Sequence, residues 1–305
     1  MRPLIRRLVA GVATLRPDDP ALVAGLRLSA RLGAELHLVH VASPGTPSGS
    51  FDLARQRRVL QGVVERVAPG ATATGRVLCL VVTGAPERRL LDFADEVEAD
   101  LLVLGTTRRT ALASAMLGTT AGHVIRGSRT PVLVVREPLP DRPLRVLLTT
   151  DLSRHAAFAH SWGGVLAGAL CAPEAAEMRS LFVDTPVVGE LPASRDQVHL
   201  HAERELVDFL RVEVPPTLST PRLRRGDPTA EIVREAQEWD ADLLVLGTHG
   251  RRGAERLFLG SVAETVLRHA PCAALVIPPQ RPYRMKAGHA AAEGRATQAE
   301  APAGV

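Results

Sequence analysis

The sequence predicts an α/β protein made of two consecutive doubly wound domains, each built on a five-stranded parallel sheet. The octapeptide Ala-Asp-Leu-Leu-Val-Leu-Gly-Thr occurs at Ala99–Thr106 and again 142 residues later, at Ala241–Thr248. Around these landmarks, short β-branched or leucine-rich runs alternate with longer amphipathic stretches, the pattern of repeated β-α crossovers. A length of 305 residues also suits two cores, because single cores stop growing at about 250–300 residues.

The strand positions follow from the β-branched and leucine-rich runs, and the helices from the amphipathic stretches between them. In the first half we expect strands at 8–12, 36–41, 76–82, 101–105 and 132–135. In the second half we expect strands at 146–149, 179–183, 222–225, 243–247 and 274–277, and helices at 154–169, 197–212, 229–239 and 261–269.

A proline-rich segment marks the boundary between the halves. Residues 137–143 contain three prolines, which cannot continue a helix and favour an extended connector. Beyond residue 279 the chain is rich in Pro, Gly, Ala and Gln without periodicity, a composition typical of disorder. The predicted divisions are a first domain at 1–137, a linker at 138–143, a second domain at 144–279 and a disordered tail at 280–305.

Composition excludes several classes of protein. The chain is 46% hydrophobic and 23% charged with a net charge of +4, and its arginines are scattered, so we expect no nucleic-acid partner. The single lysine, Lys286, lies in the predicted tail, which excludes a Walker-type phosphate loop. Three separated cysteines without a C-x-x-C pair indicate buried thiols, and the apolar runs are too short for a signal peptide or a membrane span. We therefore expect a cytoplasmic protein.

The second octapeptide runs into a glycine-rich loop with the spacing G-x2-G-x9-G-S, from Gly247 to Ser261. Such glycines let backbone N–H groups approach a phosphate, and the following helix offers unpaired N–H groups and a positive dipole end. Arg251 and Arg252 could neutralise phosphate charge, and His249 could contact a phosphate or only fill the loop. A surface loop with a helix cap is the alternative interpretation.

In both halves the chain resembles the universal stress protein family, whose ATP-binding members share this glycine spacing after the fourth strand. The aspartate that closes the first strand of the second half, Asp151, also matches, as do Gly226-Asp227-Pro228 and Pro271. The resemblance implies a Rossmann-like fold of the adenine nucleotide alpha hydrolase type that holds ATP, with Mg²⁺ as a candidate companion. The implied nucleotide site comprises Thr150, Asp151, Val183, Gly247, Thr248, His249, Gly250, Arg252, Gly253, Gly260, Ser261 and Val262.

The first half departs from this pattern at two positions. Ala13 stands where the second half has Asp151, and it cannot accept a hydrogen bond from a nucleoside. Arg108 replaces the second loop glycine, although Gly118-Thr119-Thr120 is retained. We therefore predict one ATP per chain, with the first half acting as a pseudo-dimer partner. In the resembled family single domains pair through their last strand, which a tandem chain can satisfy internally or by forming a homodimer.

Other constellations have simpler explanations. His199 and His201 are two residues apart on a predicted helix and point to different faces, so we expect no metal site. Asp151, Ser153 and His155 lie too close together for a catalytic triad, and Ser153 is better explained as a helix cap.

The expected function is that of a stress-response protein that binds ATP in its second domain and acts on an unknown protein partner as a sensor or regulator. No catalytic residue is predicted, so at most a weak ATPase is expected. A scaffold that needs no nucleotide is the main alternative, and an ATP-using enzyme is the second.

Overall fold

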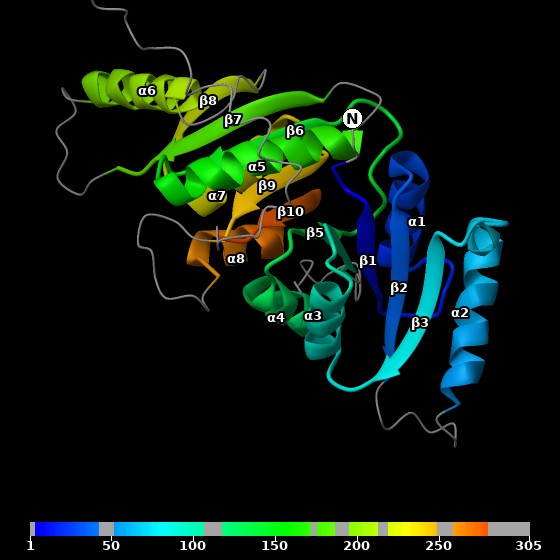
Figure 1. Cartoon of the computed structure of the whole chain (residues 1–305). Coiled ribbons are helices and arrows are strands. Elements are labelled where there is room, and N and C mark those ends of the chain that lie inside the picture. The colour runs from blue at the N-terminus through cyan, green and yellow to red at the C-terminus, as the bar shows by residue number, and fades with distance from the viewer. Residues whose placement is uncertain are drawn as a thin grey trace, which may run out of the picture.

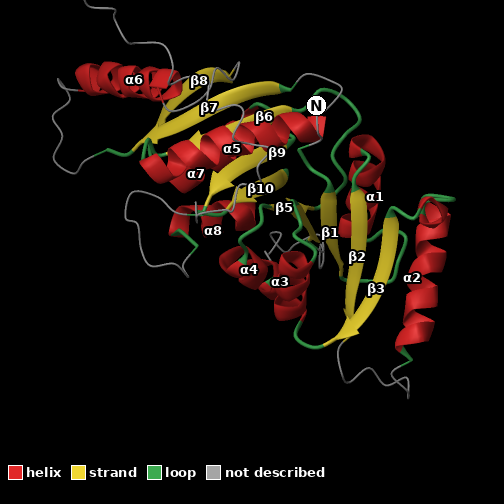
Figure 2. Cartoon of the chain, in the orientation of Figure 1, coloured by secondary structure: helices red, strands yellow, loops and turns green. Residues whose placement is uncertain are grey.

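The computed structural model describes residues 4–42, 52–106, 118–171, 176–186, 195–212, 219–248 and 259–279. Strands and helices alternate along both halves, which confirms the predicted α/β fold class (Figures 1 and 2). The first half contains β1 (Arg7–Val12), α1 (Pro20–Leu32), β2 (Glu35–Ala42), α2 (Leu53–Val67), β3 (Val77–Thr83), α3 (Pro86–Glu96), β4 (Leu101–Gly105), α4 (Thr119–Gly127) and β5 (Val132–Val135). The second contains β6 (Arg145–Thr150), α5 (Arg154–Cys171), β7 (Glu177–Asp184), α6 (Arg195–Val212), β8 (Ser219–Arg225), α7 (Pro228–Glu238), β9 (Leu243–Gly247), α8 (Ser261–His269) and β10 (Ala273–Ile277).

The two halves share one sheet. In the described part of the chain its ten strands have the order β3-β2-β1-β4-β5-β10-β9-β6-β7-β8, and within each half all pairs are parallel. The halves join where β5 and β10 pair antiparallel, with Leu133 opposite Leu275. The last strands of the two repeats therefore pair within a single chain.

The repeat is visible in the strand register. Leu36 of β2 pairs with Val77 of β3, and Met178 of β7 pairs with Ser219 of β8, each residue 142 positions after its counterpart. Helices α3 and α7 also begin 142 positions apart. The described positions of β2, β3 and α3 thus have structural counterparts in the second half, and differences between counterparts show where the halves have diverged.

Helices cover both faces of the sheet. The core on one face contains buried residues of α1, α2 and α5, and the core on the other contains those of α3, α4, α7 and α8. Both cores include residues from both halves, and Leu133 and Leu275 lie together in the first. Cys79 and Cys171 are buried in this first core as expected, whereas Cys272 is only partly buried.

The linker bonds to both halves. Asp141 accepts a hydrogen bond from Arg31 of α1 at 2.6 Å, and the same arginine donates to the carbonyl of Leu170 in α5 at 2.9 Å. Arg142 forms a bidentate pair with Asp242 at 2.7 and 2.8 Å. Asp141 thus fixes the linker to α1, and Arg142 fixes it beside the start of β9.

A network of charged side chains replaces apolar packing between β8 and α7. The carboxylate of Glu235, whose side chain is 1% exposed, accepts hydrogen bonds from Arg179, Arg222 and Arg224. Burial works to raise the pKa of Glu235, but the guanidinium hydrogen bonds outweigh it and hold the pKa below its usual value. Arg179 also lies 4.2 Å from the ring centre of Trp239.

We expect Glu235→Ala to lower the free energy of unfolding by about 3 kcal/mol, because it leaves three guanidinium groups without their buried anion. Glu177→Ala is the matched control, since Glu177 is exposed and lies 3.8 Å from Arg145. Urea unfolding monitored by circular dichroism measures both values. Equal losses for the two variants would contradict a structural role for the network.

His160 of α5 is buried in a chain of hydroxyl groups. Its Nε2 atom lies 2.8 Å from Ser180 Oγ, and that hydroxyl donates to Ser219 Oγ at 2.8 Å. Ser180 therefore accepts from Nε2–H, and a second proton would have to lie on Nδ1, which is buried with no hydrogen-bond partner among the described residues. Burial lowers the pKa of His160 to about 4.

This depressed pKa predicts a loss of stability in mild acid. In the unfolded chain the His160 imidazole is protonated below about pH 6.5, whereas in the folded chain it is protonated only below about pH 4. The contribution of neutral His160 to the free energy of unfolding therefore falls as the pH drops from 6.5 to 4. Between pH 7 and pH 5, wild-type protein should lose about 2 kcal/mol more unfolding free energy than His160→Gln. The control is His155→Gln, which changes an exposed imidazole on the same helix and should follow the wild type.

Candidate functional site

The predicted nucleotide site falls at the carboxyl ends of three adjacent strands. Thr150 ends β6 and Asp151 follows it, Val183 lies near the end of β7, and Gly247 ends β9. Because β9, β6 and β7 are neighbours in the sheet, the structure brings these residues to one edge. His249, Gly250, Arg252 and Gly253 lie outside the described residues, as does Arg251.

The end of β9 is tied directly to the start of α8. The N–H of Gly260 donates to the carbonyl of Thr248 at 2.9 Å, and the N–H of Thr248 donates to Ile277 of β10 at 3.2 Å. Gly260 precedes the first helical residue, and within the described chain no side chain caps the helix. Ser261 and Val262 are exposed. The first-turn N–H groups of α8, which cannot be satisfied within a helix, thus lie at an exposed helix start.

The backbone conformation at position 260 does not require a glycine. Its φ of −56° is accessible to any residue, and an added Cβ would lie 3.4 Å from the Thr248 carbonyl oxygen, an ordinary contact. What glycine provides at this position is therefore space in front of the helix, which a branched side chain would fill.

Asp151 lies in a tight turn between β6 and α5. Its Oδ1 accepts from the N–H of Ser153 at 3.0 Å, and the hydroxyl of Thr150 accepts from the N–H of Leu152 at 3.0 Å. Leu152 has a φ of +63°, which makes the turn sharp. Ser153 accepts from the N–H of Ala156 at 3.2 Å, which confirms its predicted role as a helix cap.

Two charged residues at the same edge were not predicted. Asp184 is the last residue of β7, next to Val183, and its Oδ2 lies 3.8 Å from Nε of Arg225 at the end of β8. Their counterparts in the first half are Ala42 and Thr83. Applying the repeat offset residue by residue along the strands could have identified this difference from the sequence.

The first half is arranged differently at the corresponding edge. The carboxylate of Asp19, which is 2% exposed, accepts hydrogen bonds from the N–H groups of Ala13 and Thr14 and from the Thr14 hydroxyl. Its other oxygen accepts from the first-turn N–H groups of α1. The backbone N–H groups that directly follow β1 therefore already have a hydrogen-bond acceptor within the protein, the Asp19 carboxylate. Arg108 lies outside the described residues.

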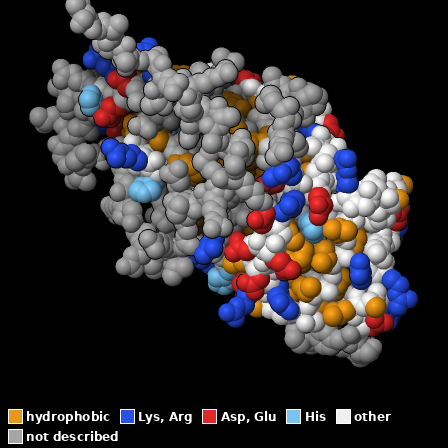
Figure 3. Space-filling model, in the orientation of Figure 1, with side chains coloured by type: hydrophobic (Ala, Val, Ile, Leu, Met, Phe, Trp, Pro, Cys, Tyr) orange, Lys and Arg blue, Asp and Glu red, His pale blue; other side chains and the backbone are white. Residues whose placement is uncertain are grey.

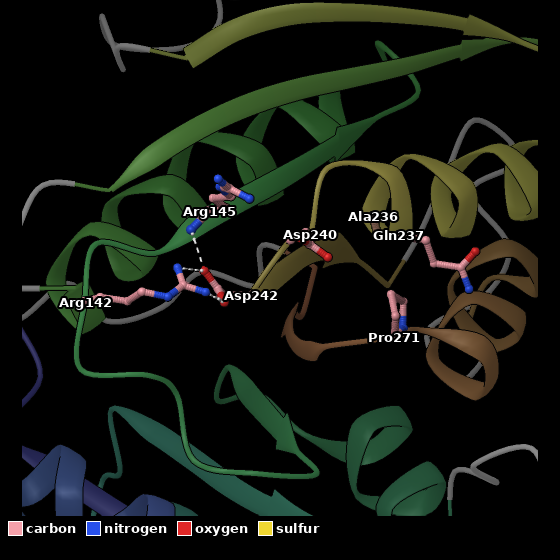
Figure 4. Close-up of a pocket in the computed structure, with 8 residues that line it drawn as sticks. Arg142, Arg145, Ala236, Gln237, Asp240, Asp242 and Pro271 are labelled. Atoms are coloured by element: carbon pink, nitrogen blue, oxygen red, sulfur yellow. Dashed lines mark hydrogen bonds and ion pairs between the residues drawn. The ribbon is translucent and has the colours of Figure 1, made fainter.

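A hollow of about 630 Å³ lies at the opposite edge of the sheet, at the amino-terminal ends of the second-half strands (Figure 4). The bidentate pair of Arg142 and Asp242 lines one side of it. Because the lining residues lie at the starts of β6 and β9, the hollow is distinct from the predicted nucleotide edge at the ends of these strands. Its lining residues are Arg142, Arg145, Ala236, Gln237, Asp240, Ala241, Asp242 and Pro271.

The described residues contain no group of three His, Cys, Asp or Glu side chains arranged to hold a metal ion. His201 lies 3.5 Å from Glu205 on α6, and the side chain of His199 is outside the described part. Among the described helices, none combines the length and the apolar character needed to cross a lipid bilayer.

Comparison with known proteins gives the class of this chain. The family model for the universal stress protein family matches residues 5–136 and again residues 144–278. The chain therefore belongs to the universal stress protein family. The two matches show that it carries the family domain twice in tandem.

Relatives support this assignment. A universal stress protein of Methanocaldococcus jannaschii is 31% identical over 121 residues, covering 37% of this chain and 71% of that protein. One from Mycobacterium tuberculosis is 29% identical over 207 residues, covering 62% of this chain and 68% of that protein. The crystal structure of a putative universal stress protein from Pseudomonas aeruginosa shares the fold, with a TM-score of 0.69 at 17% identity over 90% of this chain and 94% of that one.

Proposed function

We propose that the second half binds ATP at the carboxyl ends of β6, β7 and β9, and that the chain acts as a nucleotide-dependent regulator. The start of α8 carries the proposal, because an uncapped, exposed helix start follows a glycine that keeps the space before it open. Phosphate oxygens are the groups that such N–H donors and such a dipole attract. The nucleotide would lie across the strand ends, a usual ligand position in open α/β sheets.

The other residues at this edge would hold the nucleoside. Asp151, whose carboxylate is fixed in the turn by the N–H of Ser153, offers an acceptor for ribose or base donors. The main chain at Val183 lies on the neighbouring strand and would contact the base. Asp184 and Arg225 extend this polar edge, whereas their counterparts in the first half are the uncharged Ala42 and Thr83.

The first half is proposed to bind no nucleotide and to complete the shared sheet. Asp19 occupies the N–H groups after β1, so a ligand there would have to displace a buried carboxylate with five hydrogen bonds. Slow or no hydrolysis is expected in the second half, because it contains no lysine to stabilise the transferred phosphoryl group.

Isothermal titration with ATP should give a stoichiometry of about one per chain, and Gly260→Val should abolish measurable binding because its side chain fills the space before α8. The matched control is Gly118→Val at the equivalent position before α4, where an added Cβ meets no atom within 4 Å. That variant should bind like the wild type. Two equivalent sites, or full affinity in Gly260→Val, would refute the proposal.

We expect Asp151→Ala to weaken ATP affinity about tenfold while leaving affinity for inorganic triphosphate unchanged, because the lost carboxylate contacts the nucleoside and not the phosphates. Competition between ATP and triphosphate in the titration separates the two effects. A parallel loss for both ligands would place Asp151 at the phosphates instead.

A further inference from the structure

Helix α6 is held to the sheet through one short apolar stripe. It lies beside β7 and β8, at the second-half end of the sheet (Figure 1). The stripe consists of Ala202, Leu206 and Phe209, all buried, whereas most of the other described side chains of α6 are exposed and polar or charged. Figure 3 shows charged and histidine side chains where α6 lies in Figure 1.

Among the described residues, the stripe of α6 does not join the cores on the two sheet faces. Phe209 packs with Ala157 of α5. Ala202 and Leu206 pack with Phe182 of β7 in a second small cluster. In the first half, α2 likewise connects the second and third strands, but its buried residues belong to the main core of their face: Leu60, Val63 and Val64. The packing therefore lets α6 leave the sheet without opening either core.

Polar side chains separate α6 from the core beneath it. On the face of β7 that α6 covers, Met178 packs against the core and Phe182 against α6, with Ser180 between them. Ser180 Oγ lies 2.8 Å from Nε2 of the buried His160. The His160 ring meets the ring of Phe209 edge-on, with the ring centres 5.9 Å apart. The apolar contacts of α6 thus end at a hydrogen-bonded polar layer.

The corresponding layer of the first half is apolar. Ser180 donates to Ser219 of β8, and the counterparts of these two serines, 142 residues earlier, are Leu38 and Val77. Both counterparts are buried in the core to which α2 belongs. Apolar packing is therefore continuous beneath α2 and interrupted beneath α6.

Leu152 connects α6 to the turn after β6. Its partly buried side chain packs in both α6 clusters. It directly follows Asp151, whose Oδ1 accepts from the N–H of Ser153 at 3.0 Å. Its φ of +63° is unusual for a bulky residue, and such a conformation persists only where the surrounding contacts hold it. A change in the position of Asp151 therefore moves the side chain against which α6 packs.

The equivalent turn of the first half makes different contacts. Thr14 follows Ala13 at the position of Leu152, and its N–H and hydroxyl groups donate to Asp19. The connection between turn and helix thus belongs to the half in which we place the nucleotide.

We propose that α6 docks and undocks as a unit, and that Leu152 couples this docking to the ligand held by Asp151. The coupling to ATP rests on the proposed function of the second half. A ligand that fixes the Asp151 carboxylate fixes the turn, and the fixed turn keeps Leu152 in both α6 clusters. Loss of the ligand loosens the turn and favours undocked α6, which exposes its apolar stripe.

Hydrogen exchange of the full chain, followed by mass spectrometry, tests whether α6 opens separately. Without nucleotide, the amides of residues 200–212 should exchange at least about 100-fold faster than those of α2, because α2 opens only together with the core. Equal protection of the two helices would overturn the proposal.

The connection through the turn is also measured without nucleotide. Asp151→Ala removes the acceptor that holds the turn and should speed exchange in α6 at least about fivefold. The matched control is Asp227→Ala, which removes a similar bond, 2.9 Å long, from the N–H of Ala230 at the start of α7 on the opposite face. Exchange in α6 should be unchanged in the control, and equal acceleration in both variants would contradict the connection.

Saturating ATP should slow exchange in α6 at least about fivefold in the wild type. Leu152→Ala should still bind ATP but lose this slowing. Its matched control is Leu223→Ala, which removes a partly buried leucine of the same α6 cluster that lies on β8, away from the turn. This control should speed exchange in α6 and keep the response to ATP.

The outcomes separate this inference from the proposed function. ATP binding in the titration without slower exchange in α6, or slowing that persists in Leu152→Ala, would overturn the coupling and leave the proposed ATP site intact. A titration without ATP binding would refute the proposed function instead. The comparison of Asp151→Ala with Asp227→Ala, made without nucleotide, would then decide by itself whether the turn controls α6.

Discussion

The antiparallel pairing of β5 with β10 is the constraint on which the architecture depends. It pairs the backbone groups of one edge strand from each half, β5 and β10, which two separate five-stranded sheets would leave exposed. It also lets the apolar cores on both faces extend from one half into the other. The linker reinforces this join, since Asp141 bonds to α1 and Arg142 to the start of β9. The first half is thereby retained as a structural partner whether or not it holds a ligand.

That shared frame allows the halves to diverge at their edges. At the carboxyl edge the second half has Asp151 and Asp184, whereas the first has Ala13 and Ala42. The outer strands also differ, because β8 carries arginines that pair with the buried Glu235, whereas β3 is apolar. The single sheet thus has carboxylates at the carboxyl edge of its second half and an apolar outer strand in its first half.

Much of the fold was predictable because the apolar periodicity and the repeated octapeptide can each be recognised within short stretches of the sequence. Ser153 could be assigned as a helix cap from its position alone, and the hydrogen bond to Ala156 confirms it. The role of Asp19 was not predictable, since it depends on how the segment between β1 and α1 brings its carboxylate back to the N–H groups of Ala13 and Thr14. Asp184 was not predicted because it stands out only when it is compared with its counterpart in the first half, Ala42.

The sequence by itself determined the class of fold, the number of repeats and their family, and it predicted the strand ends at which we propose that a nucleotide binds. It did so because apolar periodicity and glycine spacing are local properties of the chain. The tertiary structure alone decided that the repeats form one sheet, which carboxylates face a free edge, and which strand is left apolar at the surface. The join of the repeats, for example, arises from residues 142 positions apart, Leu133 and Leu275, whose contact no local pattern specifies.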